Sequence, residues 1–75
     1  MRIKEMRKRA YLKELRDRME LTQSEVADQL GISQNYYSAI ETGERQSKMT
    51  IDMALKLAKI FAVTIDVILE NENHS

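Results

Sequence analysis

The chain has 75 residues, of which 43% are hydrophobic and 32% charged, and it contains no proline, no cysteine and two glycines. This length fits one small domain with a single core, and the scarcity of proline and glycine predicts an all-helical chain. The absence of cysteine excludes a disulfide scaffold, a cysteine-ligated zinc site and a thiol nucleophile. Because the one histidine is His74 in a polar tail, we expect no metal and no cofactor.

No segment is typical of a membrane span or a secretion signal. The longest stretch without a charge, residues 29–40, contains Gln, Ser, Asn and Gly, so it is too short and too polar to cross a bilayer. The first ten residues, MRIKEMRKRA, are basic, but no apolar run follows them, as it would in a signal peptide. We therefore expect a cytoplasmic protein with no membrane partner.

The formal net charge is zero, but the charges are distributed unevenly. Residues 1–18 hold eight basic and three acidic side chains, whereas residues 19–75 hold four basic and nine acidic ones. A polyanion responds to the local field within about 10 Å at moderate salt. The basic segment is therefore either a surface for nucleic acid or an ordinary solvated helix, and the charges alone favour neither.

A first helix is predicted from about residue 7 to residue 19, because apolar residues recur at helical spacing at Leu12, Leu15 and Met19. A second stripe, Ile3, Met6 and Ala10, is slightly out of phase with the first. Residues 1–9 therefore form either a basic N-terminal extension or the start of this helix.

Two short helices follow in close succession. Thr22 and Glu25 form a capping box, which predicts a helix that begins at residue 23 and ends at Gly31. Ser33 is a second N-cap, so a third helix is predicted over residues 34–41, ending near Gly43. Because so short a turn joins them, the two helices must cross steeply.

The helical spacing also divides the residues of this pair between two faces. Val26, Leu30, Tyr37 and Ile40 are predicted to face the core, and the Tyr37 hydroxyl must then reach the rim or find a partner. The outward positions of the third helix hold hydrogen-bonding or stacking residues without charge: Gln34, Asn35, Tyr36 and Ser38.

The remaining chain is predicted to form a loop and two more helices. Residues 44–49 are polar, and Thr50 caps a fourth helix, whose expected apolar face is Ile51, Ala54, Leu55, Ala58 and Phe61. Thr64 caps a short fifth helix that is apolar nearly all round, with Ile65, Val67, Ile68 and Leu69. Such a helix must be buried on more than one side.

An ordered set of motifs resembles the Cro/phage-repressor (XRE-type) helix-turn-helix family. The motifs are L-x-x-L-R at 12–16, L-T-Q at 21–23, A-x-x-x-G-I-S at 27–33, S-x-I-E-x-G at 38–43 and L-K-L-A-K at 55–59. The resemblance implies a compact five-helix bundle of the lambda-repressor-like type, in which helices 2 and 3 form the helix-turn-helix and helix 3 enters the DNA major groove. It divides the chain into residues 1–9, a DNA-binding domain at 10–70, and a polar tail at 71–75.

The resemblance also assigns roles to individual residues. Positions for base or groove contact fall on Gln34, Asn35 and Ser38, and positions for phosphate contact fall on Gln23, Ser33, Arg45, Ser47 and Lys48. The aromatic ring of Tyr36 is a further candidate for groove contact, because it can stack on a sugar or touch a thymine methyl. Arg16 and Glu41 match a buried ion pair between the first and third helices. The chemistry agrees, because Gln and Asn pair bidentately with adenine and free helix-start N–H groups favour phosphate. The basic cluster at 7–9 is either an arm on the DNA backbone or a solvated helix start.

Several positions depart from the family pattern. Glu20 and Ala62 stand where relatives often have glycine, and the usual proline before the fourth helix is absent. We expect the corner at Ala62 to be strained or locally rearranged.

The resulting hypothesis is a regulator that binds double-stranded DNA as a homodimer. It would repress transcription from a pseudo-palindromic operator, with recognition helices roughly 34 Å apart, and dimerise through Ile65, Ile68 and Leu69. The alternatives are an antitoxin that neutralises a partner toxin and a protein-interaction module that has lost DNA binding. We expect no enzyme and no small-molecule substrate, because the chain has no Ser/His/acid set and no phosphate-cradling glycine loop.

Overall fold

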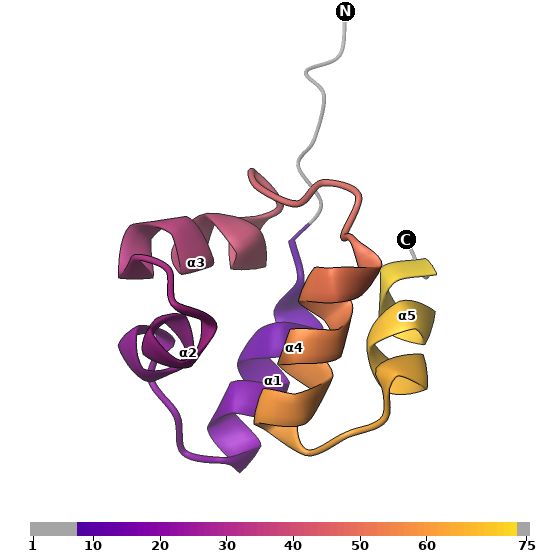
Figure 1. Cartoon of the computed structure of the whole chain (residues 1–75), viewed down its shortest axis with the longest axis horizontal. Coiled ribbons are helices and arrows are strands. Elements are labelled where there is room, and N and C mark those ends of the chain that lie inside the picture. The colour runs from indigo at the N-terminus through magenta and orange to yellow at the C-terminus, as the bar shows by residue number, and fades with distance from the viewer. Residues whose placement is uncertain (1–7, 74–75) are drawn as a thin grey trace, which may run out of the picture.

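The computed structural model describes residues 8–73, which form five helices and contain no strand. The helices are α1 (Ala10–Arg18), α2 (Gln23–Leu30), α3 (Gln34–Thr42), α4 (Ile51–Phe61) and α5 (Ile65–Asn73). Figure 1 shows α1 and α4 in the middle of the bundle, with α2 and α3 on one side and α5 on the other. The predicted all-α bundle of five helices is confirmed.

Side-chain caps at the predicted residues set three of the helix starts. The Thr22 hydroxyl accepts from the Glu25 N–H, and the Glu25 carboxylate accepts from the Thr22 N–H. The hydroxyls of Ser33 and Thr50 cap α3 and α4. Each cap satisfies an amide that the helix itself leaves without a partner. The predicted starts of α2, α3 and α4 are therefore confirmed.

Left-handed residues end α2, α3 and α4. Gly31 and Gly43 have φ of 75° and 90°, so the predicted glycine ends are confirmed. Ala62 ends α4 with φ of 57°, and Glu20 has φ of 56°. A left-handed conformation costs an L-residue about 1–2 kcal/mol, so the strain expected at Ala62 is present. Gln46, in the loop after α3, has φ of 54°, which the sequence did not indicate.

The first helix begins later than the spacing predicted. Lys8 and Arg9 are not helical, and α1 starts at Ala10. Residues 1–7, including the stripe residues Ile3 and Met6, lie outside the described part of the chain. At the other end Met19 is 42% exposed instead of buried, because it lies beyond the last helical residue and turns away from the core.

A single apolar core joins the five helices. Its fully buried side chains come from every helix, and the largest are Tyr37, Leu12, Ile40, Leu57, Ile68 and Val26. Leu30, which was predicted to face the core, is only partly buried at its edge.

The buried face of α4 differs from the predicted one. Ile51 and Leu55 are 62% and 45% exposed, and the buried residues are Ala54, Leu57, Ala58 and Phe61. The buried face of α4 is rotated about the helix axis relative to the predicted face. Leu57 therefore enters the core, and Ile51 and Leu55 turn toward solvent.

The fifth helix is less buried than its composition predicted. Ile68 is fully buried, whereas Ile65, Val67 and Leu69 are only partly covered. The reason is geometric: α5 packs mainly against α4 at the side of the bundle, which leaves its flanks partly open (Figure 1).

Candidate nucleic-acid interface

The helix-turn-helix is built from α2, a three-residue turn and α3. Ala27, 1% exposed, lies on the buried face of α2, and its carbonyl accepts from the Ile32 N–H at 3.0 Å. Gly31 adopts the left-handed turn that this bond requires. Tyr37 and Ile40 then anchor α3 in the core, which fixes the face that α3 presents to solvent.

That exposed face carries most of the residues expected to read DNA. Gln34, Asn35 and Tyr36 are exposed in the first turn of α3, and Ser38 is partly buried. The Arg45 guanidinium lies 5.8 Å from the centre of the Tyr36 ring, within the range of a cation–π contact. The structure therefore brings an exposed residue of α3, expected to contact the groove, together with a basic residue of the following loop.

Arg16, Glu41 and Gln23 form a buried polar bridge under this surface. Arg16 Nε donates to Glu41 Oε2 at 2.6 Å, and Arg16 Nη2 lies 3.3 Å from Oε1. Gln23 Nε2 donates to the same Oε1 at 2.9 Å. The structure thus places the expected ion pair between α1 and α3, and adds the first residue of α2 to it.

The bridge shifts the pKa values of its members in opposite directions. Burial opposes ionisation of Glu41, but the hydrogen bonds from Arg16 and Gln23 outweigh it and hold the pKa of Glu41 below its usual value. The hydrogen bond to Glu41 raises the pKa of Arg16, against the effect of burial. Both groups are therefore charged at neutral pH.

The Tyr37 hydroxyl does not reach the rim of the bundle, as one alternative predicted, but lies beside the Glu41 carboxylate. The residue is fully buried, and among the described residues its hydroxyl has no hydrogen-bond partner. Burial and then the neighbouring Glu41 carboxylate raise its pKa. Arg16 and Gln23 donate to the oxygens of the same Glu41 carboxylate.

The expected phosphate-binding residues of the loop lie at the surface. Arg45, Ser47 and Lys48 are exposed, as is Ser33 at the start of α3. Glu44 is exposed among them, so the loop is not uniformly basic. An open depression beside Gln23 is lined by Lys8 and Lys13 and by the residues around Glu41, which adds positive charge near the start of α2.

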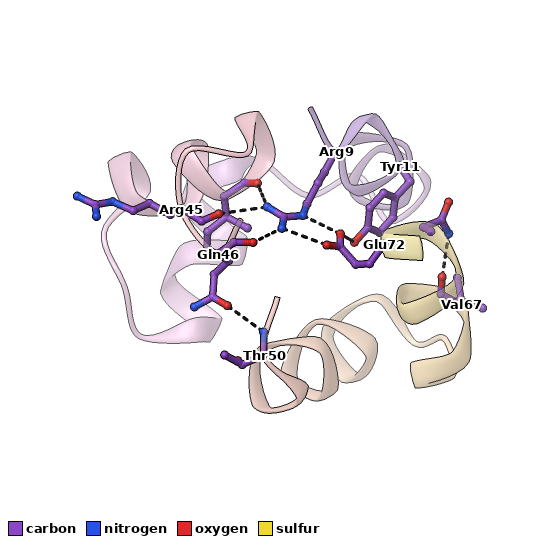
Figure 2. A network of polar contacts seen from close by, with 9 residues as sticks. Arg9, Tyr11, Arg45, Gln46, Thr50, Val67 and Glu72 are labelled. Atoms are coloured by element: carbon purple, nitrogen blue, oxygen red, sulfur yellow. Dashed lines mark hydrogen bonds and ion pairs between the residues drawn. The ribbon is translucent and has the colours of Figure 1, made fainter. Parts of the chain in front are cut away.

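Arg9 has a role that the sequence did not reveal. It was expected to lie on DNA or in solvent, but it is only 5% exposed. Figure 2 shows its guanidinium between the loop after α3 and the last turn of α5, where it donates to main-chain carbonyls and to Glu72. A basic cluster gives no sign of which arginine is buried, so only the tertiary fold could identify it.

One residue expected at a dimer interface is unavailable for that role. Ile68 is fully buried inside this chain and cannot contact a second copy without opening the core. Its position on α5 points toward α4, because helices at the side of a bundle turn one stripe inward. Ile65 and Leu69 are partly exposed on the same helix.

The part of the chain that the structure describes has neither a membrane span nor a metal site. None of its helices is long and apolar enough to cross a bilayer. Likewise, residues 8–73 bring together no group of three His, Asp or Glu side chains that could hold a metal ion.

Comparison with protein families agrees with this geometry. A family model described as helix-turn-helix matches residues 12–68. Because the match spans most of the sequence, the chain belongs to this helix-turn-helix family, of XRE type, and its five helices form a lambda-repressor-like fold. The family is one of DNA-binding regulators. Comparisons with curated proteins and with solved structures gave no match.

Proposed function

We propose that this protein is a transcriptional repressor that binds a pseudo-palindromic operator as a homodimer, with α3 in the major groove. The observation that carries the proposal is the surface of α3. Gln34, Asn35 and Tyr36 stand exposed in its first turn, while Tyr37 and Ile40 lock its other face into the core. A rigid helix with uncharged hydrogen-bonding groups at its start suits the reading of base edges.

The groups around α3 suit the phosphates that flank a groove. Arg45, Ser47 and Lys48 follow α3 in an exposed loop. At the start of α2, one amide N–H of Gln23 donates to Glu41, which leaves its second amide N–H for a phosphate oxygen. Helix-start N–H groups at α2 and at Ser33–Gln34 add partial positive charge. Such contacts position the protein without reading sequence.

The proposed dimer uses the open flanks of α5. Ile65 and Leu69 are partly exposed there, four residues apart on one face of the helix. Two copies joined through this face would present their α3 helices to successive major grooves if the helices lie roughly 34 Å apart. Ile68 contributes by holding α5 to the bundle and not by contact with the partner copy.

Selection from a randomised duplex pool, followed by sequencing of the bound fraction, tests the proposal. We expect an enriched inverted repeat with half-sites one helical turn apart, and sedimentation of the complex as two chains per duplex. A double variant, Gln34→Ala with Asn35→Ala, should bind the pool but lose the enrichment. A folded wild-type protein that enriches no sequence would overturn the proposal and favour a protein-interaction module.

A further inference from the structure

The Arg9 side chain joins three parts of the molecule that are far apart in the sequence. These are the segment before α1, the end of α3 with the loop that follows it, and the last turn of α5. Its Nη1 donates to the Ile40 carbonyl in α3 at 2.6 Å and lies 3.2 Å from the Arg45 carbonyl in the loop. Its Nη2 donates to the Gln46 carbonyl. Its Nε and Nη2 donate to the two carboxylate oxygens of Glu72, at 2.7 and 3.1 Å. Figure 2 shows these bonds spreading from one guanidinium group.

This arrangement holds the loop after α3 in a conformation that it would not adopt readily alone. Gln46 has a left-handed backbone with φ of 54°, which is costly for a residue with a side chain. The turn directs the carbonyls of Arg45 and Gln46 toward Arg9. The same loop is tied at its far end, where the Gln46 side chain accepts from the Thr50 N–H at 3.1 Å. Arg9 thus offsets the strain at Gln46.

The buried charge of Arg9 depends on Glu72 in the last turn of α5. A buried guanidinium is stable only with a charged partner and satisfied hydrogen bonds. Glu72 supplies the carboxylate, and the Tyr11 hydroxyl donates to the same carboxylate. The carboxylate is largely buried, with 16% of the Glu72 side chain exposed. The loop is therefore held through a group that belongs to the last turn of α5.

We propose that Arg9 and Glu72 are positioning residues that fix the loop carrying Arg45, Ser47 and Lys48 for phosphate contact, so that DNA affinity depends on the last turn of α5. The inference rests on the proposed function for the identity of the ligand. Its structural half, the hold of Glu72 on the loop, does not require DNA. The two halves are measured separately.

Substitution of Glu72 gives a test in which a pure charge effect and a loss of loop positioning predict opposite changes in DNA affinity. Glu72→Gln keeps the size of the side chain and removes one negative charge, so simple electrostatics predicts tighter binding to DNA. Loss of the clamp predicts binding about tenfold weaker, because a buried cation without its anion leaves its place. The matched control is Glu70→Gln, an exposed position on the same helix, which should bind as tightly as wild type or slightly more tightly.

Amide hydrogen exchange of the free protein reports the loop directly. The Arg45 N–H donates to the Ala39 carbonyl, and the Thr50 N–H donates to the Gln46 side chain. We expect both amides to exchange faster in Glu72→Gln and to be unchanged in Glu70→Gln. Arg9→Lys should act like Glu72→Gln although it keeps the charge, because one ammonium group cannot reach all the carbonyls. Arg18→Lys, at an exposed position of α1, is its control.

Tyr11→Phe tests the same pair in a protein that keeps its aromatic packing. It removes only the hydroxyl that donates to Glu72, and we expect a loss of affinity of about twofold with slightly faster exchange at Arg45. Thermal unfolding of each variant identifies the temperature range in which it is folded, and affinities are compared there.

The outcomes separate the inference from the proposed function. Faster loop exchange with weaker DNA binding in Glu72→Gln and Tyr11→Phe supports the inference. A folded Glu72→Gln protein with unchanged loop exchange, or with DNA affinity equal to that of Glu70→Gln, overturns it. A wild-type protein that binds no duplex overturns the proposed function instead, and the exchange data still decide whether Glu72 positions the loop.

Discussion

Two buried arginine–glutamate pairs hold the candidate DNA-binding side of this protein to the bundle, and they differ in what they grip. Arg16 and Glu41 join α1 to α3 and engage the side chain of Gln23 at the start of α2. Arg9 and Glu72 join the residue before α1 to the last turn of α5 and engage main-chain carbonyls instead. The first pair braces a helix, and the second braces a loop.

This difference predicts which property each pair controls. A helix is already ordered by its own hydrogen bonds, so the Arg16–Glu41 pair mainly fixes its orientation and contributes to the stability of the core. A loop with a strained residue has several accessible conformations, so the Arg9–Glu72 pair selects one of them. Loss of the first pair should therefore reduce global stability, and loss of the second should chiefly loosen a surface.

Glu41→Ala should produce the largest effect on stability. It leaves the Arg16 guanidinium without its anion in a site where both side chains are 10% exposed, and it releases Gln23. Removing one partner of a buried pair costs about 3–5 kcal/mol, measurable by urea unfolding. Glu44→Ala, at an exposed position, is the control and should change little. A loss below about 1 kcal/mol would show that the first pair is as dispensable as a surface salt bridge.

The lowered pKa of Glu41 predicts a specific response to acid. The carboxylate binds protons more weakly in the folded than in the unfolded protein, so its ionised form contributes stability above the ordinary pKa that the group has in the unfolded chain. That contribution is lost as the pH falls through the still lower folded pKa. Unfolding free energies between pH 7 and pH 3 should fall less steeply for Glu41→Gln than for wild type. Equal slopes for the two proteins would show that Glu41 does not contribute to the loss of stability in acid.

Substitutions on α3 and in the loop that follows it should change DNA binding in different ways, because we expect α3 to contact bases and the loop to contact phosphates. Gln34→Ala should weaken binding to the selected operator by about 1–3 kcal/mol and relax the choice of base at one position. Arg45→Ala should weaken binding to all duplexes alike and flatten the dependence of affinity on salt. Titrations at several salt concentrations, on operator and random duplexes, measure both. Selective loss on the operator alone would contradict the phosphate role of Arg45.

The sequence predicted the parts of the fold that depend on short-range chemistry. The caps at Thr22, Ser33 and Thr50 and the glycine ends are set by residues a few positions apart, and the structure has them all. The strained corner at Ala62 was visible because an L-residue replaces a glycine there. Helical periodicity gave the faces of α2 and α3 but placed the buried stripe of α4 one step off, because its neighbours decide which edge is covered.

The sequence predicted those residues of the candidate site that belong to a family motif. It did not predict the residues that come together only through tertiary contacts. Arg16 and Glu41 lie 25 residues apart, and both fall in the family motifs, whereas Arg9 and Glu72 lie 63 residues apart. Glu72 falls in the segment that was predicted to be a polar tail but forms the last turn of α5. No local pattern distinguishes Arg9 from its basic neighbours. The burial of Ile68, which removes it from the proposed dimer surface, likewise follows only from how α5 packs on α4.

The smallest predicted effects concern the tyrosines beside the two glutamates. Tyr11 donates to Glu72, whereas Tyr37 is buried near Glu41 with no hydrogen-bond partner among the described residues. Tyr11→Phe should therefore reduce stability by about 1 kcal/mol, and Tyr37→Phe should leave it unchanged or raise it by about 1 kcal/mol, because a buried unpaired hydroxyl costs free energy.

Urea unfolding of both phenylalanine variants at neutral pH measures this difference under one set of conditions. Both substitutions remove only a hydroxyl group and keep the aromatic ring. The sign of the change in unfolding free energy therefore shows whether that hydroxyl makes a stabilising hydrogen bond. If Tyr37→Phe instead destabilises the protein by as much as Tyr11→Phe, the Tyr37 hydroxyl donates to Glu41 in solution. The two pairs would then be equivalent triads of arginine, glutamate and tyrosine, and only the carbonyls bound by Arg9 would distinguish the loop brace from the helix brace.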